Sequence, residues 1–257
     1  MFVPPVSRRT RARGALLLSV LAYEGVTQRF GSRIALDGVT LRIDQGERVA
    51  LVGPSGSGKT SLFRLAYAAF APTAGRVLLE NVDLAPLHGR SLRLARAKVA
   101  VIFQAHGLID RLTAGQNAIA GSFGRRNTVD SIRAILAPTE NERAVVRGAL
   151  QRVGLADRID DLVFTLSGGQ RQRVAVARAI VQEAHLVLAD EPAASLDPEL
   201  ARDVVALLLD DAKTRGATLV CTLHQPELTV GFDRVIELEH GRVVGDGPAA
   251  RFVLEAG

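Results

Sequence analysis

The segment that most narrows what this chain can fold into is Gly53-Pro54-Ser55-Gly56-Ser57-Gly58-Lys59-Thr60. It fits the pattern G-x-x-x-x-G-K-[ST] and directly follows the apolar run 49–52, which is typical of a buried strand. Its glycines let consecutive backbone N–H groups face phosphate oxygens, while Lys59 adds a positive charge and the Thr60 hydroxyl can bind Mg²⁺. A helix that starts near Gly58 points the positive end of its dipole at the same anion. The sequence therefore predicts a loop that binds a nucleoside triphosphate.

Three other apolar runs resemble the strand before this loop, namely Val99 to Phe103, Leu186 to Ala189 and Thr218 to Leu223. Several of them are apolar at consecutive positions, as strands are when both faces of the sheet are covered. They predict a mostly parallel α/β sheet, and such sheets bind ligands beyond the carboxyl ends of their strands. We therefore expect the chemistry in the first residues after each run.

An acidic pair, Asp190-Glu191, follows the third of these runs. Adjacent acidic residues alone usually mark a solvated turn. At the end of a buried strand, and in a chain with a phosphate loop, they indicate two separate roles. Asp190 is expected to orient the Mg²⁺ shell, and Glu191 is expected to accept a proton from an attacking water or to align it.

Between Gln104 and Leu166 the pattern changes to helical stretches such as Ala144 to Val153, interrupted by several glycines and Pro138. This predicts a helical insertion carried by the sheet.

The basic character of the chain is concentrated at its start. The formal net charge is +5, and Arg8, Arg9, Arg11 and Arg13 precede the first acidic residue, which leaves about +1 for the remainder. A nearly neutral domain gives no reason to expect nucleic acid as a partner. The arginines and the apolar run after them are compatible with a signal peptide, but the favoured interpretation is a tail over residues 1–15 followed by a first strand at Val20 to Tyr23.

The run Leu166-Ser167-Gly168-Gly169-Gln170 resembles the signature of ABC transporter ATP-binding subunits, and the 23 residues from Ser167 to Asp190 match that family. Its chemistry can also be derived directly. The hydroxyl and N–H groups of Ser167, Gly168 and Gly169 open a predicted helix, Gln170 to Glu183, and form a second anion site. The lone Cys221 cannot form an internal disulfide.

The resemblance assigns roles to further residues, each at the end of a predicted strand or in a loop. Gln104 is similar to the glutamine that senses Mg²⁺ and water, and His224 to the histidine that contacts the γ-phosphate. Ser195, Leu196 and Asp197 resemble a loop that communicates across a dimer. Phe30 falls where the family stacks an aromatic ring on adenine, with Tyr23 as the competing candidate. The nucleotide would contact Phe30, residues 53–60 and Ser61, and Mg²⁺ would contact Thr60, Gln104 and Asp190. The remaining histidines match no motif: His88, His106, His185 and His240.

The implied fold is an α/β phosphate-loop NTPase core with a mostly parallel sheet, an antiparallel β subdomain at the N-terminal side and a helical signature subdomain at about 105–170, all within one domain, 16–257. The implied cofactors are ATP and Mg²⁺. The family also implies a head-to-tail homodimer formed on ATP binding, integral-membrane permease subunits, a substrate-binding protein and a place on the cytoplasmic face of the membrane.

Longer stretches resemble the phosphonate importer branch of the family, above all Ala194-Ser195-Leu196-Asp197-Pro198 and Leu223-His224-Gln225. Pro226 departs from that branch. Two alternatives remain open: an ATPase of another importer, and an ATPase of a non-transport assembly such as a phosphonate-degrading or cell-division complex. Nucleic-acid-linked relatives carry long coiled coils, zinc insertions or tandem nucleotide domains, which this chain lacks.

Overall fold

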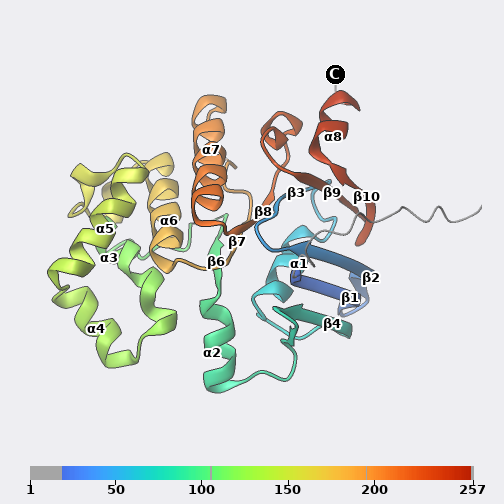
Figure 1. Cartoon of the computed structure of the whole chain (residues 1–257), viewed down its shortest axis with the longest axis horizontal. Helices are drawn as coiled ribbons and strands as arrows, with labels where there is room; N and C mark the ends of the chain where they lie inside the picture. The colour runs from blue at the N-terminus through green and yellow to red at the C-terminus, as the bar shows by residue number, and fades with distance from the viewer. Residues whose placement is uncertain (1–18, 105, 195, 256–257) are drawn as a thin grey trace, which may run out of the picture.

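A six-stranded sheet, in the order β10-β9-β3-β8-β7-β6, runs through the centre of the structure (Figure 1). The computed structural model describes residues 19–104, 106–194 and 196–255. Five of the six strands are parallel, and only the edge strand β10 is antiparallel to its neighbour. The sheet is therefore mostly parallel, as predicted. Its strands are β3 Arg48–Val52, β6 Val99–Ile102, β7 Leu186–Ala189, β8 Thr218–Thr222, β9 Arg234–Glu239 and β10 Arg242–Pro248.

Both faces of this sheet are covered, which explains why its strands are apolar at consecutive positions. On β7, Val187 and Ala189 belong to a core shared with helices α6 (Gly168–Gln182) and α7 (Pro198–Arg215). Leu186 and Leu188 belong to a second core shared with α1 (Lys59–Ala66) and the antiparallel sheet. Since alternate side chains of a strand point to opposite faces, a strand between two cores has no polar face.

The antiparallel sheet has the order β2-β1-β4-β5 and lies beside α1 (Figure 1). Its strands are β1 Ser19–Phe30, β2 Arg33–Asp44, β4 Ala74–Leu79 and β5 Val82–Asp83. The predicted first strand at Val20 to Tyr23 is confirmed, and it continues to Phe30 before a tight turn. The Arg-rich tail, 1–15, lies outside the residues that the structure describes.

Short helices fill the stretch between β6 and α6, at the end of the molecule away from the antiparallel sheet (Figure 1). The helix predicted at Ala144 to Val153 begins earlier, at Glu140. The reason is a reciprocal cap in which Thr139 and Glu142 each bond the other's backbone N–H. The signature helix also begins earlier than predicted, because Ser167 caps it. The short helices are α3 Ala114–Ile119, η1 Ala120–Arg125, α4 Thr128–Leu136, α5 Glu140–Arg152, η2 Ala156–Arg158 and η3 Val163–Thr165.

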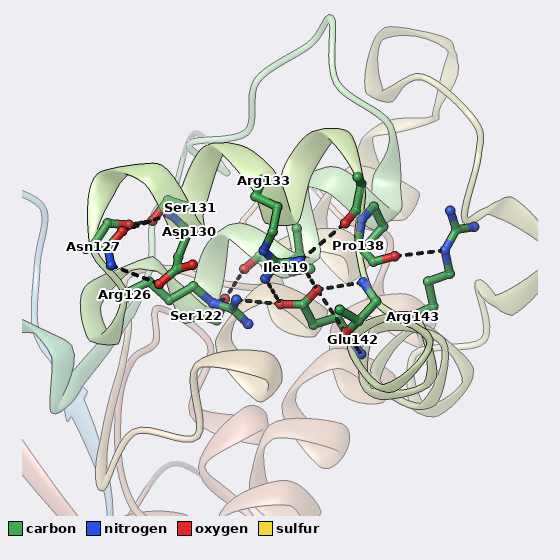
Figure 2. A network of polar contacts seen from close by, with 12 residues as sticks. Ile119, Ser122, Arg126, Asn127, Asp130, Ser131, Arg133, Pro138, Glu142 and Arg143 are labelled. Carbon is green, nitrogen blue, oxygen red and sulfur yellow. Dashed lines mark hydrogen bonds and ion pairs between the residues drawn. The ribbon is translucent and has the colours of Figure 1, made fainter.

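Glu142 ties α4 to α5 (Figure 2). Its carboxylate accepts hydrogen bonds from Arg133 on α4, at 2.6 and 3.0 Å, and from Arg126 just before that helix. The Arg133 guanidinium, together with bonds from Thr139 and Arg126, holds the pKa of Glu142 well below its usual range. This network fixes the orientation of α4 on the rest of the helical subdomain.

Three further elements lie outside the parts described so far. They are α2 Gly89–Ala97, η4 Pro226–Thr229 and α8 Ala249–Glu255. Across the described ranges, none of the helices combines the length and the apolar character that crossing a membrane requires.

Candidate functional site

The predicted phosphate loop connects β3 to α1, and its backbone requires glycine. Gly53 and Gly58 have φ angles of 139° and 112°. A Cβ on Gly53 would overlap the carbonyl of Leu238, and one on Gly58 would lie 2.6 Å from the Ala35 carbonyl oxygen. No side chain caps the start of α1 at Gly58, so its first N–H groups face the loop. The loop is therefore a backbone cradle at a helix N-terminus, which suits a phosphate group.

Lys59 is held inside this cradle. Its Nζ donates to the carbonyl oxygens of Gly53 at 2.7 Å and Pro54 at 3.0 Å, and only 5% of the residue is exposed. Burial lowers the pKa of Lys59, while the charges of Glu191 and Asp190 act in the opposite direction. The Ser57 hydroxyl in the same loop is buried and has no hydrogen-bond partner. A cation held by carbonyls and an unpaired hydroxyl donor fit an anionic ligand such as a triphosphate.

The acidic pair follows β7, as predicted, and Thr222 at the end of β8 fixes both members. The Glu191 N–H donates to the Thr222 hydroxyl oxygen at 2.6 Å, and that hydroxyl donates to Asp190 Oδ1 at 3.1 Å. Glu191 adopts a left-handed backbone, with φ of 49°. Burial raises the pKa of Asp190, and hydrogen bonds from Thr222 and Thr60 partly offset this. Sequence reasoning missed Thr222; the available signal was a polar residue at the end of a buried run, next to His224.

Three predicted residues meet at the carboxylate of Glu191. Gln104 Nε2 donates to Oε2 at 2.7 Å, and His224 Nε2 donates to Oε1 at 2.6 Å. They lie 87 and 33 residues from Glu191 in the sequence. Since β6, β7 and β8 are neighbouring parallel strands, their carboxyl ends bring the three side chains to one place. We name this group Gln104, Glu191 and His224 the carboxylate cluster.

The signature segment has a separate environment. Ser167 caps α6: its Oγ accepts from the Gln170 N–H at 3.3 Å, and Gln170 Oε1 accepts from the Ser167 N–H at 2.9 Å. Ser167 and Gly168 are exposed, and Leu166 is buried. Within the described ranges, no hydrogen bond or ion pair joins residues 166–170 to residues 53–61. One chain therefore does not bring the two predicted anion sites together.

The predicted dimer loop is described in part. Asp197 caps α7 by accepting from the Leu200 N–H at 2.9 Å, and Leu196 packs against the core beside α6. Ser195 lies outside the residues that the structure describes.

The two aromatic candidates have different surroundings. Tyr23 is 1% exposed, and its hydroxyl donates to the Leu62 carbonyl at 2.9 Å, so its ring is part of the core. Phe30 is 47% exposed at the end of β1 and meets Phe70 edge to face, with ring centroids 5.4 Å apart. Burial makes Tyr23 unsuitable for stacking on a base, whereas Phe30 remains available.

The remaining histidines have local contacts. His88 caps α2, His185 lies 3.1 Å from Glu80, and His240 is exposed beside Glu239. His106 contacts Gln172, a contact that sequence reasoning did not predict.

The family described as ABC transporter matches residues 36–194. Similar curated proteins include a phosphonates import ATP-binding protein (PhnC 1) of Rhodopseudomonas palustris, 43% identical over 90% of this chain and 86% of the relative. Another, from Frankia casuarinae, carries the same phosphonates import description and is 42% identical over 90% of this chain and 91% of the relative.

Solved structures with similar folds are ATP-binding cassettes. The dimeric cassette MJ0796 in a post-hydrolysis state bound to ADP and Pi aligns with a TM-score of 0.78 and 29% identity, over 89% of this chain and 98% of that one. The protein cbiO1 of Clostridium perfringens, part of the complex cbiONQ, aligns with a TM-score of 0.79 and 26% identity, over 93% and 92% of the two chains.

Proposed function

Because this chain belongs to the ABC transporter family, we propose that it is the subunit that hydrolyses ATP to drive an importer of phosphonates or related phosphorus oxyanions. The observation that carries the proposal is the position of the carboxylate cluster. It joins the ends of β6, β7 and β8, and the charges of Asp190 and Glu191 act on Lys59 in the adjacent phosphate loop. A proton acceptor thus lies beside a cradle for phosphate.

In this proposal the loop residues 53–61 hold the triphosphate, and Lys59 exchanges its backbone carbonyl partners for the β- and γ-phosphate oxygens. Phe30 stacks on the adenine. A water attacks the γ-phosphorus, the bond from that phosphorus to the oxygen of the β-phosphate breaks, and Glu191 takes the proton of the water. Gln104 and His224 hold the two oxygens of that carboxylate, so its orientation is set before the substrate binds.

The side chains present also suit magnesium. Asp190 accepts hydrogen bonds from Thr222 and Thr60, which places a carboxylate and a hydroxyl at one point beside the loop. Among the described residues, no group of three or more His, Cys, Asp or Glu could hold a metal. This agrees with a Mg²⁺ site that uses one carboxylate, the Thr60 hydroxyl, the Gln104 amide and phosphate oxygens. When bound, Mg²⁺ would neutralise charge that develops on the phosphates.

The assembly is proposed from the same geometry. The exposed signature of one subunit, residues 166–170, would complete the nucleotide site of another in a head-to-tail dimer, with Leu196, Asp197 and Ser195 near the contact. The dimer would bind integral-membrane permease subunits on the cytoplasmic face of the membrane and work with a substrate-binding protein. Phosphonate as cargo rests on the described function of the relatives.

Reconstitution tests this function. The chain is placed in liposomes with a candidate permease and binding protein from the same genome, and phosphate release is measured with methylphosphonate, inorganic phosphate or maltose. We expect phosphonate to stimulate hydrolysis. Stimulation by another cargo alone would indicate a different importer. A pull-down with the chain as bait tests the partners separately. If it recovers only soluble enzymes, the result would contradict a role in transport.

A further inference from the structure

The backbone that follows Gln104 has a conformation that needs outside support. His106 and Gly107 both lie in the left-handed region, with φ of 61° and 58°. A Cβ on Gly107 would lie 3.0 Å from the ring of Phe103. A non-glycine residue such as His106 adopts this region only at a cost in free energy. Contacts from elsewhere must hold the segment 106–107 in place.

Helix α6 supplies that support through Arg178. Its guanidinium donates from Nη1 to the Gly107 carbonyl at 2.5 Å and from Nη2 to the His106 carbonyl at 3.0 Å. Burial lowers the pKa of Arg178. Among the described residues, no carboxylate forms a salt bridge with it. A partly buried guanidinium therefore directs two of its donors to two consecutive carbonyls.

Gln172, two turns earlier on α6, makes a second contact with this segment. Its Oε1 accepts from His106 Nδ1 at 2.5 Å, and the residue is 2% exposed. The Gln172 Nε2 is buried and has no hydrogen-bond partner. A buried donor without a partner lowers stability, so an apolar side chain at this position would be more favourable for stability alone. The feature that a polar side chain adds at this position is therefore the hydrogen bond with His106.

We propose that Arg178 and Gln172 are positioning residues for Gln104, which they act on by fixing the backbone of residues 106 and 107 against α6. This inference rests on the proposed function, because Gln104 donates to the carboxylate of Glu191 at 2.7 Å. The same helix begins at the cap Ser167. One rigid element therefore carries the signature at its first turn and, three turns later, the anchor for a member of the carboxylate cluster.

The consequence concerns the timing of hydrolysis. If α6 shifts when Ser167 meets nucleotide in a partner subunit, Arg178 and Gln172 move residues 106–107 with it. Gln104 then moves relative to Glu191. A purely structural role for Arg178 would instead change stability without a specific effect on Gln104.

The test compares Arg178→Lys and Gln172→Leu with the matched control Arg125→Gln, whose guanidinium donates to the Val181 carbonyl in the last turn of α6 and not to residues 106–107. A lysine ammonium is a single point donor and lacks the planar fork with which the Arg178 guanidinium holds the two carbonyls from two separate nitrogens. In the full chain we expect Arg178→Lys to lower kcat about ten- to a hundredfold, because small misplacements cost that much, with KM for ATP nearly unchanged. The Arg125→Gln control should keep wild-type kcat.

A double-mutant cycle with Gln104→Ala separates positioning from stability. If Arg178 acts through Gln104, the double variant should be no slower than Gln104→Ala alone. If the losses of kcat from Arg178→Lys and Gln104→Ala multiply in the double variant, the inference would be overturned.

Hydrogen exchange gives a readout that does not depend on activity. Amides of residues 103–109 should exchange faster in both α6 variants than in the wild type, and as fast as wild type in Arg125→Gln. Unchanged exchange would overturn the positioning role even if Arg178→Lys folds poorly, because Gln172→Leu fills the same space. A wild-type chain that does not hydrolyse ATP would instead contradict the proposed function, and the exchange data would still decide this inference.

Discussion

The carboxylate cluster and the signature segment differ in how much of their chemistry one chain completes. In the cluster, residues from three strands meet within hydrogen-bond distance, and both oxygens of Glu191 are engaged. In the signature, Ser167 and Gln170 bond only each other's backbone at the exposed start of α6. The first region is assembled by the fold of one subunit. The second is a preformed helix N-terminus that needs a ligand from outside.

This difference divides the proposed site between two copies of the chain. Substitutions in the cluster should stop chemistry in whichever subunit carries them. Substitutions in the signature should leave nucleotide binding to the monomer intact and affect only hydrolysis in a dimer.

Glu191→Gln keeps the size and shape of the side chain but replaces the proton-accepting carboxylate with a neutral amide, in which only the oxygen accepts hydrogen bonds. We expect kcat to fall about 100- to 10,000-fold, the usual contribution of a general base, while ATP binding persists and an ATP-bound dimer accumulates. Phosphate release and gel filtration with ATP measure the two effects. Wild-type turnover in this variant would remove Glu191 from the mechanism.

Lys59→Ala removes a cation that lies inside the phosphate loop. Because hydrogen bonds to charged groups are worth about 1.5–3 kcal/mol, we expect ATP to bind roughly ten- to a hundredfold more weakly. Fluorescence titration with a labelled ATP analogue measures the affinity. An unchanged Kd would show that the nucleotide does not occupy the cradle.

Ser167→Arg places a bulky cation at the exposed cap of α6. We expect hydrolysis to fall about tenfold or more through the lost contact with nucleotide of a partner, while the monomer binds ATP normally. The matched control is Thr139→Arg, which breaks the same kind of cap on α5 and should cost about 1 kcal/mol of stability without changing kcat. Equal loss of binding and hydrolysis in Ser167→Arg would argue against a shared site.

Asp190→Asn is expected to change the melting temperature of the nucleotide-free chain by only a few degrees. Since burial raises the folded-state pKa of Asp190 above its unfolded value, the ionised carboxylate lowers stability once the pH rises through that raised pKa. The Asn variant without nucleotide should melt a few degrees higher than wild type near neutral pH. The difference should shrink as the pH falls toward the unfolded value of about 3.9. Scanning fluorimetry across pH checks this, and a variant that is less stable at every pH would contradict it.

Elements that local pattern dictates could be predicted from the sequence. Runs buried on both faces identified β3, β6, β7 and β8, and the glycines at 53 and 58 identified the loop because only glycine fits there. The sequence predicted that Gln104, Glu191 and His224 lie at strand ends. The hydrogen bonds between them became visible only with the order of the strands in the sheet.

Contacts that depend on tertiary packing could not be predicted. Tyr23 and Phe30 lie on the same strand, and the tertiary core around Tyr23, including its hydrogen bond to the Leu62 carbonyl, decides which ring is buried. Arg178 acts through the carbonyl groups of His106 and Gly107, which lie 72 and 71 residues away in sequence and leave no local signal. The early start of α5 is different, because it could have been predicted from the sequence: Thr139 and Glu142 have the spacing of a reciprocal cap.

Mixing two impaired variants tests the division of the site most directly. Lys59→Ala keeps an intact signature and Ser167→Arg keeps an intact phosphate loop, so a mixed dimer contains one complete site. At equal concentrations we expect hydrolysis to recover to at most about a quarter of the wild-type rate, because half of the dimers are mixed and each has one working site of two. A mixture that remains as inactive as its components would contradict a nucleotide site shared between two subunits.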